Sequence, residues 1–219
     1  MFDRAEIQDR LRCLGTVALL WKKGGLEDSD VAAFAEAATR ADWRLPPREM
    51  IDIVLKHRVA PLAPLFVDLL KAKDAPILGG ALAALGTIGT KDHARLIAPF
   101  LAHPQPAVQQ AAADALGRLK AAEYSAEVAA QLKSRDPMTR AVAAVALGTM
   151  KATGYVSDVA ALLDDRELAP RNLGALALGD LGAKDRADAI ATLLKSRDIS
   201  SRWSAAASLA RLGAVEKAR

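Results

Sequence analysis

The sequence predicts an all-α protein, an α-solenoid in which helical hairpins stack into a right-handed superhelix. Three observations support this prediction. A Leu followed by a small residue recurs every 31 residues, other apolar residues recur at fixed distances from it, and aromatic residues make up only 4% of the chain. A fixed period of this size is typical of stacked arrays, in which each unit buries its apolar faces against its neighbours. Small-residue helix packing needs few aromatic side chains, whereas strands are enriched in them.

The marker occurs five times between residues 66 and 213, as Leu85-Gly86, Leu116-Gly117, Leu147-Gly148, Leu178-Gly179 and Leu209-Ala210. Two apolar columns precede it, four residues apart: Phe66, Ile97, Val128, Val159 and Ile190, then Leu70, Leu101, Leu132, Leu163 and Leu194. That spacing places both columns on one face of a first helix. Small residues four positions before the marker leucine predict that second helices approach one another closely. The sequence thus predicts five 31-residue hairpins.

Each repeat is predicted to be helix, turn, helix. In the third repeat we expect a first helix over about 125–133 and a second over about 138–149. Pro137 suits the first turn of the second helix, and Asp136 can cap it by accepting from its free N–H groups. The same column holds Asp74, Gln105, Asp136, Glu167 and Asp198. Four residues later stand Leu78, Gln109, Arg140, Arg171 and Arg202, so acid and arginine could form ion pairs within or between the last three repeats.

Residues 1–60 lack the marker but are predicted to form three helices, over about 4–22, 29–40 and 47–58. Gly24-Gly25 separates the first two, and Leu45-Pro46-Pro47 the next two. We interpret this segment as a helical cap on the five repeats of residues 61–219, within one continuous structural unit, because a solenoid needs an atypical end unit. A degenerate sixth repeat made of the second and third helices would serve the same purpose. No such unit follows Gly213, which leaves self-association through the uncapped last repeat as an option.

The charge and the cysteine content limit the classes of function and the compartments that fit this sequence. The net charge of +4 is spread over many repeats, so nucleic-acid binding is not expected. Cys13 is the one cysteine, which fits a reducing compartment. The start of the chain is mixed in charge, unlike a secretory signal. The uncharged stretch of residues 13–21 is far shorter than the roughly 20 residues that span a bilayer. We expect a cytoplasmic protein that does not insert into membranes.

The sequence contains no catalytic signature. The three histidines, His57, His93 and His103, form no His-Glu pair and no His-x-x-x-His on a helix face. A zinc site would need more than one cysteine with histidines at ligand spacing. No serine lies in a Gly-x-Ser-x-Gly setting. We therefore predict no enzyme activity, no metal and no cofactor.

The run Asp136-Pro137-Met138-Thr139-Arg140-Ala141-Val142-Ala143-Ala144-Val145-Ala146-Leu147-Gly148 resembles the second half of a HEAT-like repeat, of the short kind found in phycobilin lyase subunits. The resemblance covers about 150 of the 219 residues and concerns packing and capping chemistry, so it implies a fold rather than a function. It implies that second helices line a concave face. It also implies that the residue after the arginine position is exposed (Gly79, Gln110, Ala141, Asn172 and Trp203), together with the residues four and eight later.

Three of those positions carry apolar residues where the family has polar ones: Val145, Leu176 and Trp203. We predict that they form a strip on the concave face with a polar edge of Asn172, Asp180 and Arg211. A helix of a partner protein could dock there, because tryptophan is often a binding anchor. The alternative is that Trp203 folds over the open C-terminal end as a makeshift cap.

The sequence therefore predicts a non-enzymatic scaffold or adaptor that binds a protein partner on its concave face, in an assembly or signalling role. The alternative is an accessory subunit of a tetrapyrrole (bilin) lyase. A bilin is acidic and planar, so a Trp203–Arg211 edge could hold one. The sequence does not identify the partner or the pathway.

Overall fold

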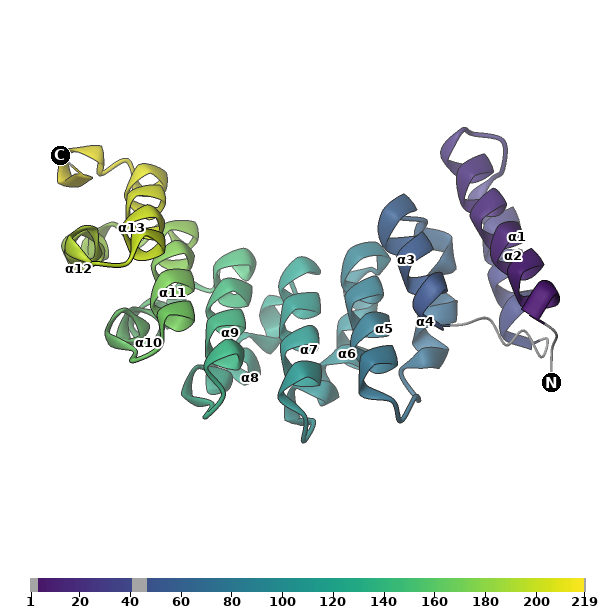
Figure 1. Ribbon diagram of the computed structural model, residues 1–219, viewed down its shortest axis with the longest axis horizontal. Coiled ribbons are helices and arrows are strands. Elements are labelled where there is room, and N and C mark those ends of the chain that lie inside the picture. The colour runs from purple at the N-terminus through teal and green to yellow at the C-terminus, as the bar shows by residue number, and fades with distance from the viewer. Residues whose placement is uncertain (1–3, 41–46, 219) are drawn as a thin grey trace. The chain divides into compact units, whose positions relative to one another are not determined.

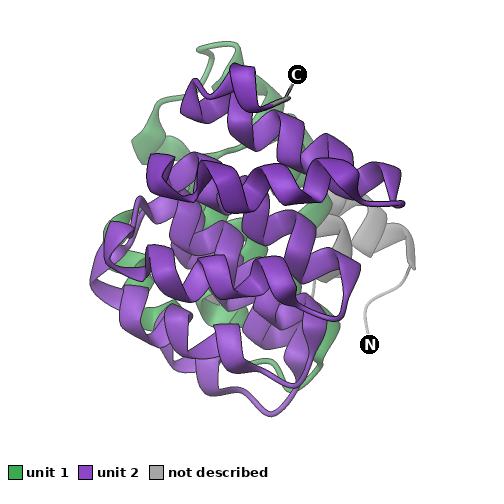
Figure 2. Cartoon of the chain, turned by 90° about the vertical axis from the view of Figure 1, so that its left-hand side faces the viewer, with its two compact units in different colours: residues 1–97 green, residues 98–219 purple. Residues whose placement is uncertain are grey.

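The computed structural model describes residues 4–40 and 47–218, and all regular structure within those ranges is helical. The chain divides into two compact units, residues 1–97 and 98–219, coloured green and purple in Figure 2. The boundary falls inside the first helix of one sequence repeat, where Ala94–Ile97 is continued by Ala98–Ala102. The all-α fold is as predicted. The division into a cap of residues 1–60 and an array of residues 61–219 stays a prediction.

Unit 1 holds the three N-terminal helices, the first repeat and the start of the second repeat. Its elements are α1 (Arg4–Lys22), α2 (Asp28–Arg40), α3 (Pro47–His57), η1 (Ala60–Leu62), α4 (Ala63–Leu69), α5 (Ala75–Ile88), η2 (Lys91–His93) and α6 (Ala94–Ile97). Helix α2 packs on α4, and α3 packs on α5. Since α4 and α5 are the first and second helices of a repeat, these like-on-like contacts support the proposal that α2 and α3 form a degenerate repeat.

Unit 2 is a stack of hairpins. Its elements are η3 (Ala98–Ala102), α7 (Pro106–Arg118), η4 (Ala122–Tyr124), α8 (Ser125–Ala130), η5 (Gln131–Lys133), α9 (Pro137–Met150), η6 (Thr153–Tyr155), α10 (Val156–Ala160), η7 (Ala161–Asp164), α11 (Leu168–Leu181), η8 (Lys184–Arg186), α12 (Ala187–Thr192), η9 (Leu193–Lys195), α13 (Ile199–Leu212) and η10 (Val215–Ala218). The second helices α7, α9, α11 and α13 lie side by side in one row (Figure 1). Each first helix ends in a short 3-10 segment.

The core of unit 2 consists of the sequence columns. The marker leucines Leu116, Leu147, Leu178 and Leu209 are fully buried, as are Val128, Val159 and Ile190 on the first helices. Glycines after the marker leucine let the second helices approach closely: a Cβ on Gly117 would lie 3.0 Å from the Cα of Ala146. Leucine therefore fills the space between the two layers of helices, while the small residue sets the spacing within the row.

Aspartates cap the N-termini of three of the second helices. The side chains of Asp74, Asp136 and Asp198 each accept a hydrogen bond from the N–H three residues later. Gln105 and Glu167, in the same column, make no such bond. The capping expected for Asp136 is confirmed, and it extends to the column members whose carboxylate is on the shorter side chain.

Candidate partner-binding groove

One column of the repeats holds Arg140, Arg171 and Arg202, and we call it the arginine column. Neighbouring second helices of unit 2 contact each other at the residue that follows this column. Gln110 donates from Nε2 to Asp136 Oδ2 at 2.8 Å and to Thr139 Oγ1 at 3.2 Å. Ala141 is fully buried, and Asn172 is 9% exposed and donates from Nδ2 to Ser200 Oγ at 2.8 Å. The expected exposure of Ala141 and Asn172 is therefore wrong. These positions face the first turn of the following second helix, which covers them.

Trp203 occupies the same position on α13, the last second helix of the described residues, and its side chain is 66% exposed. Beside it lies a groove of about 560 Å³ between α11 and α13. We call this the α11/α13 groove. Residues that form it include Asn172, Leu173, Leu176, Ile199, Ser200 and Trp203. Of the six residues in the predicted strip and its edge, the groove brings together Asn172, Leu176 and Trp203.

The other three predicted residues do not line the groove. Val145 is half-buried on α9. Asp180 and Arg211 lie farther along α11 and α13 and form an ion pair, with Arg211 Nε 3.5 Å from an Asp180 oxygen. The polar edge expected along the strip is thus an inter-helix contact next to the groove. The concave shape of this face, and a role for these six residues in binding, stay predictions.

Two apolar residues at the groove were not singled out from the sequence. Ile199 is 73% exposed and Leu173 is half-buried. Ile199 directly follows the capping residue Asp198, a place that Pro106 and Pro137 take in earlier repeats. The sequence signal for Ile199 was an apolar side chain in the first helical turn, at a position where two earlier repeats have proline.

The groove carries no charged side chain among the described residues that line it. Asn172 Oδ1 is buried and has no hydrogen-bond partner in the described part of the chain. Ser200 Oγ already donates to Asp198 at 2.5 Å, so Ser200 can only accept from Asn172, and Oδ1 is left without a donor. A buried acceptor of this kind costs about 1–3 kcal/mol, and an N–H from a docked molecule would satisfy it.

The family model described as HEAT repeats matches residues 62–132 and 94–172, together just over half of the chain. The chain belongs to the HEAT-repeat family. The expected HEAT-like repeats are therefore confirmed, whereas the phycobilin-lyase subtype stays a prediction. No curated protein sequence matches the chain significantly.

Solved structures resemble this HEAT-repeat protein in fold. An engineered protein from the Northeast Structural Genomics Consortium, target OR329, has a TM-score of 0.55 at 18% identity, over 92% of this chain and 97% of that chain. A second engineered protein, target OR497, has a TM-score of 0.55 at 18% identity, over 95% of this chain and 66% of that chain. A Kap121p mutant has a TM-score of 0.60 at 15% identity, over 96% of this chain but only 26% of Kap121p. At these identities the likeness shows the fold alone: a helical-repeat scaffold.

The described residues of the HEAT-repeat protein contain neither a cluster of metal-binding side chains nor a membrane-spanning helix. These residues hold no group of three or more His, Cys, Asp or Glu side chains placed to bind a metal ion. None of the helices in residues 4–40 and 47–218 is long and apolar enough to cross a membrane.

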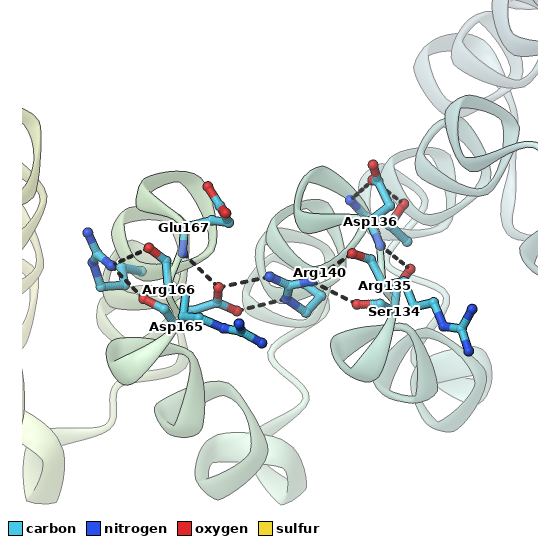
Figure 3. A network of polar contacts seen from close by, with 9 residues as sticks. Ser134, Arg135, Asp136, Arg140, Asp165, Arg166 and Glu167 are labelled. Atoms are coloured by element: carbon cyan, nitrogen blue, oxygen red, sulfur yellow. Dashed lines mark hydrogen bonds and ion pairs between the residues drawn. The ribbon is translucent and has the colours of Figure 1, made fainter.

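A largely buried ion pair joins two turns of this HEAT-repeat protein. Arg140 donates from Nε and Nη2 to the two carboxylate oxygens of Asp165, at 2.7 and 2.8 Å, and from Nη1 to the carbonyls of Ser134 and Arg135 (Figure 3). The two side chains are only 16% and 10% exposed. This bidentate geometry is the strong form of the arginine–carboxylate contact.

The arginine column behaves differently from the expected ladder of acid–arginine pairs. Arg140 pairs with Asp165, which stands two residues before the column acid Glu167. Arg171 and Arg202 donate from Nη1 to carbonyls of the turns that precede their own helices. An acid–arginine pair between repeats does form, but its acid is Asp165 and not the column acid Glu167. Among the described residues, Nη1 of each of the three arginines instead donates to the turn before its own helix.

Asp165 should make the stability of the HEAT-repeat protein sensitive to acid. Hydrogen bonds from Arg140 lower the pKa of Asp165 below its usual value. A carboxyl whose folded-state pKa is depressed contributes stability that is complete above the unfolded pKa of about 3.9 and is lost as the pH falls through the folded pKa. We expect Asp165→Asn to lower the unfolding free energy by about 1.5–3 kcal/mol at pH 7, and the difference from wild type to shrink steadily below about pH 4.

Chemical denaturation at a series of pH values checks this expectation. Asp164→Asn is the matched control, since Asp164 is adjacent but exposed, and it should change the unfolding free energy little. Although burial raises the pKa of Asp136, hydrogen bonds from Thr139 and Gln110 lower it overall, so some acid sensitivity should remain in the variant. An Asp165→Asn difference that is equal at pH 7 and at pH 2 would contradict the linkage.

Proposed function

We propose that this HEAT-repeat protein is a non-enzymatic scaffold that binds a partner protein through the α11/α13 groove. The observation that carries the proposal is the exposed indole of Trp203 beside an uncharged, largely apolar groove. Large apolar side chains gathered at one exposed place mark interaction sites, and tryptophan is enriched among residues that dominate binding energy. An assembly or signalling adaptor fits this arrangement.

The chemistry of the groove suggests what the partner presents. Its walls are two neighbouring helices, α11 and α13, with Leu173, Leu176 and Ile199 among the apolar lining residues. A row of apolar side chains from one face of a partner helix would fit between them. The unpaired Oδ1 of Asn172 would accept one N–H from that partner. We propose that the binding surface extends from this groove toward Val145, Asp180 and Arg211.

The lining of the groove gives less support to the tetrapyrrole-lyase alternative. A bilin carries carboxylates, but the described residues of the α11/α13 groove include no cation. Arg211, the residue expected to hold the pigment beside Trp203, is paired with Asp180. The same lack of cations argues against nucleic acid as the occupant. The exposed thiol of Cys13 fits the reducing cytoplasm, where we propose that the protein acts.

Trp203→Ala tests the proposed anchor. The partner is first identified by placing a photo-crosslinking residue at position 199 and analysing the adduct from the source cell by mass spectrometry. With the purified partner, Trp203→Ala should weaken the complex by about 2 kcal/mol or more, roughly thirtyfold in Kd. Met138→Ala is the control, because Met138 is an exposed apolar residue of α9 that does not line the groove.

Melting temperatures of the same variants separate an anchor from a cap. If Trp203 is an anchor, its replacement should leave the melting temperature almost unchanged. Unchanged affinity together with a lowered melting temperature would show that Trp203 caps the last hairpin. Sedimentation at several concentrations would reveal self-association through that hairpin, and visible absorbance of the purified protein would favour the lyase alternative.

A further inference from the structure

A second pocket lies on the layer of first helices in unit 2, apart from the α11/α13 groove. It has a volume of about 490 Å³ and lies between η3 on one side and α8 and η5 on the other. Polar side chains interrupt its otherwise apolar wall: Gln109, Glu127, Gln131, Lys133 and Ser134. We call it the η3/α8 pocket. Two breaks in the repeat pattern coincide there.

The first break is at Gln109 and Ser134. One repeat later, the corresponding residues are Arg140 and Asp165, whose ion pair fills the space between two consecutive turns (Figure 3). Gln109 is shorter than arginine and donates from Nε2 to one carbonyl, that of His103, at 2.7 Å. Ser134 is shorter than aspartate. Both residues line the η3/α8 pocket, so it opens where the next repeat of the same chain holds a guanidinium.

The second break is at Gln131. The same column holds Leu69, Phe100, Leu162 and Leu193 in the other repeats, so a glutamine replaces an apolar residue that is buried or half-buried there. Gln131 is only 8% exposed and donates from Nε2 to the Leu101 carbonyl at 3.0 Å. Its Oε1 is buried without a hydrogen-bond partner in the described residues. An unpaired buried acceptor is costly, so this wall of the pocket lacks a donor.

We propose that the η3/α8 pocket binds the arginine side chain of a partner protein. A guanidinium carries only donors and a planar fork of N–H groups, and the chain places its own guanidinium at the equivalent site one repeat later. Gln131 Oε1 and the carboxylate of Glu127 supply acceptors, and Leu101 and the pocket alanines cover the apolar stem. Lys133 also lines the pocket and would repel a cation. Its positive charge is balanced by the negative charge of Glu127. This site is independent of the proposed role of the α11/α13 groove.

The test uses N-acetyl-L-arginine amide, which presents an arginine side chain as a protein does. It is titrated into the full-length ¹⁵N-labelled chain while the side-chain amide signals of Gln109 and Gln131 are followed by NMR. N-acetyl-L-citrulline amide is the control, since it has nearly the same shape without the charge. We expect saturable shifts of both amides and at least about tenfold weaker binding of citrulline, because charge-assisted hydrogen bonds are the strong ones. Equal binding of both, or of neither, overturns the proposal.

Variants locate the site and separate loss of binding from loss of structure. Gln131→Leu restores the apolar column and should keep the fold while reducing affinity severalfold. Glu127→Gln should weaken the arginine probe, whereas Lys133→Gln should not. Gln109→Arg combined with Ser134→Asp should rebuild the ion pair of the next repeat, raising the melting temperature and abolishing probe binding. A double variant that melts higher but still binds the probe would overturn the assignment of the site.

Free L-arginine distinguishes the two sources of a guanidinium. It carries an ammonium and a carboxylate that a residue within a protein lacks. If the pocket is built for a partner's side chain, the capped amide should bind at least as tightly as the free amino acid. Clearly tighter binding of free L-arginine would overturn the assignment to a partner protein and indicate a small-molecule site.

Discussion

Replacing Leu147 with alanine is expected to lower the free energy of unfolding by about 2–5 kcal/mol. Leu147 lies on α9, between α7 and α11 in the row of second helices, and its side chain is fully buried. The loss combines the transfer free energy of the deleted methyl groups with the cost of the cavity that remains. A hairpin stack relaxes poorly into such a cavity, because the neighbouring backbones are already in close contact.

Chemical denaturation followed by circular dichroism measures this loss. Leu168→Ala is the matched control, since Leu168 lies in the first turn of α11 and is 45% exposed; it should cost well under 1 kcal/mol, as surface substitutions usually do. Repeats contact chiefly their neighbours, so the transition can have more than one step. Any step of the transition in which unit 2 unfolds should move to lower denaturant concentration in Leu147→Ala. A change under about 1 kcal/mol for Leu147→Ala would mean that the marker column does not form the core.

The fold was predictable because its information is local and repeated. The burial of Leu116, Leu147, Leu178 and Leu209 follows from a 31-residue column, and each column member reports on the same contact. The N-terminal helices could also be predicted from the sequence, since Gly24-Gly25 separates α1 and α2. The second helices α7, α9, α11 and α13 begin 31 residues apart, at Pro106, Pro137, Leu168 and Ile199.

The site was only partly predictable, because a period identifies a stripe on a helix without saying which neighbour covers it. Asn172 and Trp203 stand at the same repeat position, yet one is buried under the first turn of α13 and the other is largely exposed. The difference arises because α13 packs over Asn172, whereas α13 is itself the last second helix in the described part of the row. Leu176 belongs to both the predicted strip and the groove, since it lies one turn beyond the covered position.

Contacts between successive turns could not be predicted from the spacing of residues in the sequence. Arg140 and Asp165 are 25 residues apart, a separation that no helical pattern marks as a contact. The pairing follows from the distance between two stacked turns, which the sequence does not state. The η3/α8 pocket was missed for the same reason: its residues depart from the pattern one at a time, and only stacking brings Gln109 and Ser134 together.

Gly148→Val is expected to destabilise unit 2 by about 2–3 kcal/mol, the range of overpacking in a well-packed core. A Cβ at position 148 would lie 3.2 Å from the Cα and 3.3 Å from the carbonyl oxygen of Ala177 on α11. Those are backbone atoms, so they cannot rotate away. The two further methyl groups of valine would force α9 and α11 apart and reduce the contacts around Leu147 and Leu178.

Denaturation of Gly148→Val beside Gly154→Val tests whether the glycine of the Leu-Gly marker sets the distance between second helices. Gly154 is exposed and has no positive φ, and a Cβ at that position would meet no atom within 4 Å, so valine there should change the unfolding free energy by no more than about 0.5 kcal/mol. Equal effects at both positions would mean that general backbone propensity, rather than close approach, explains the marker. A selective loss at Gly148 should recur at Gly117 and Gly179, where a Cβ would meet the Cα atoms of Ala146 and Ser208 at 3.0 and 3.1 Å.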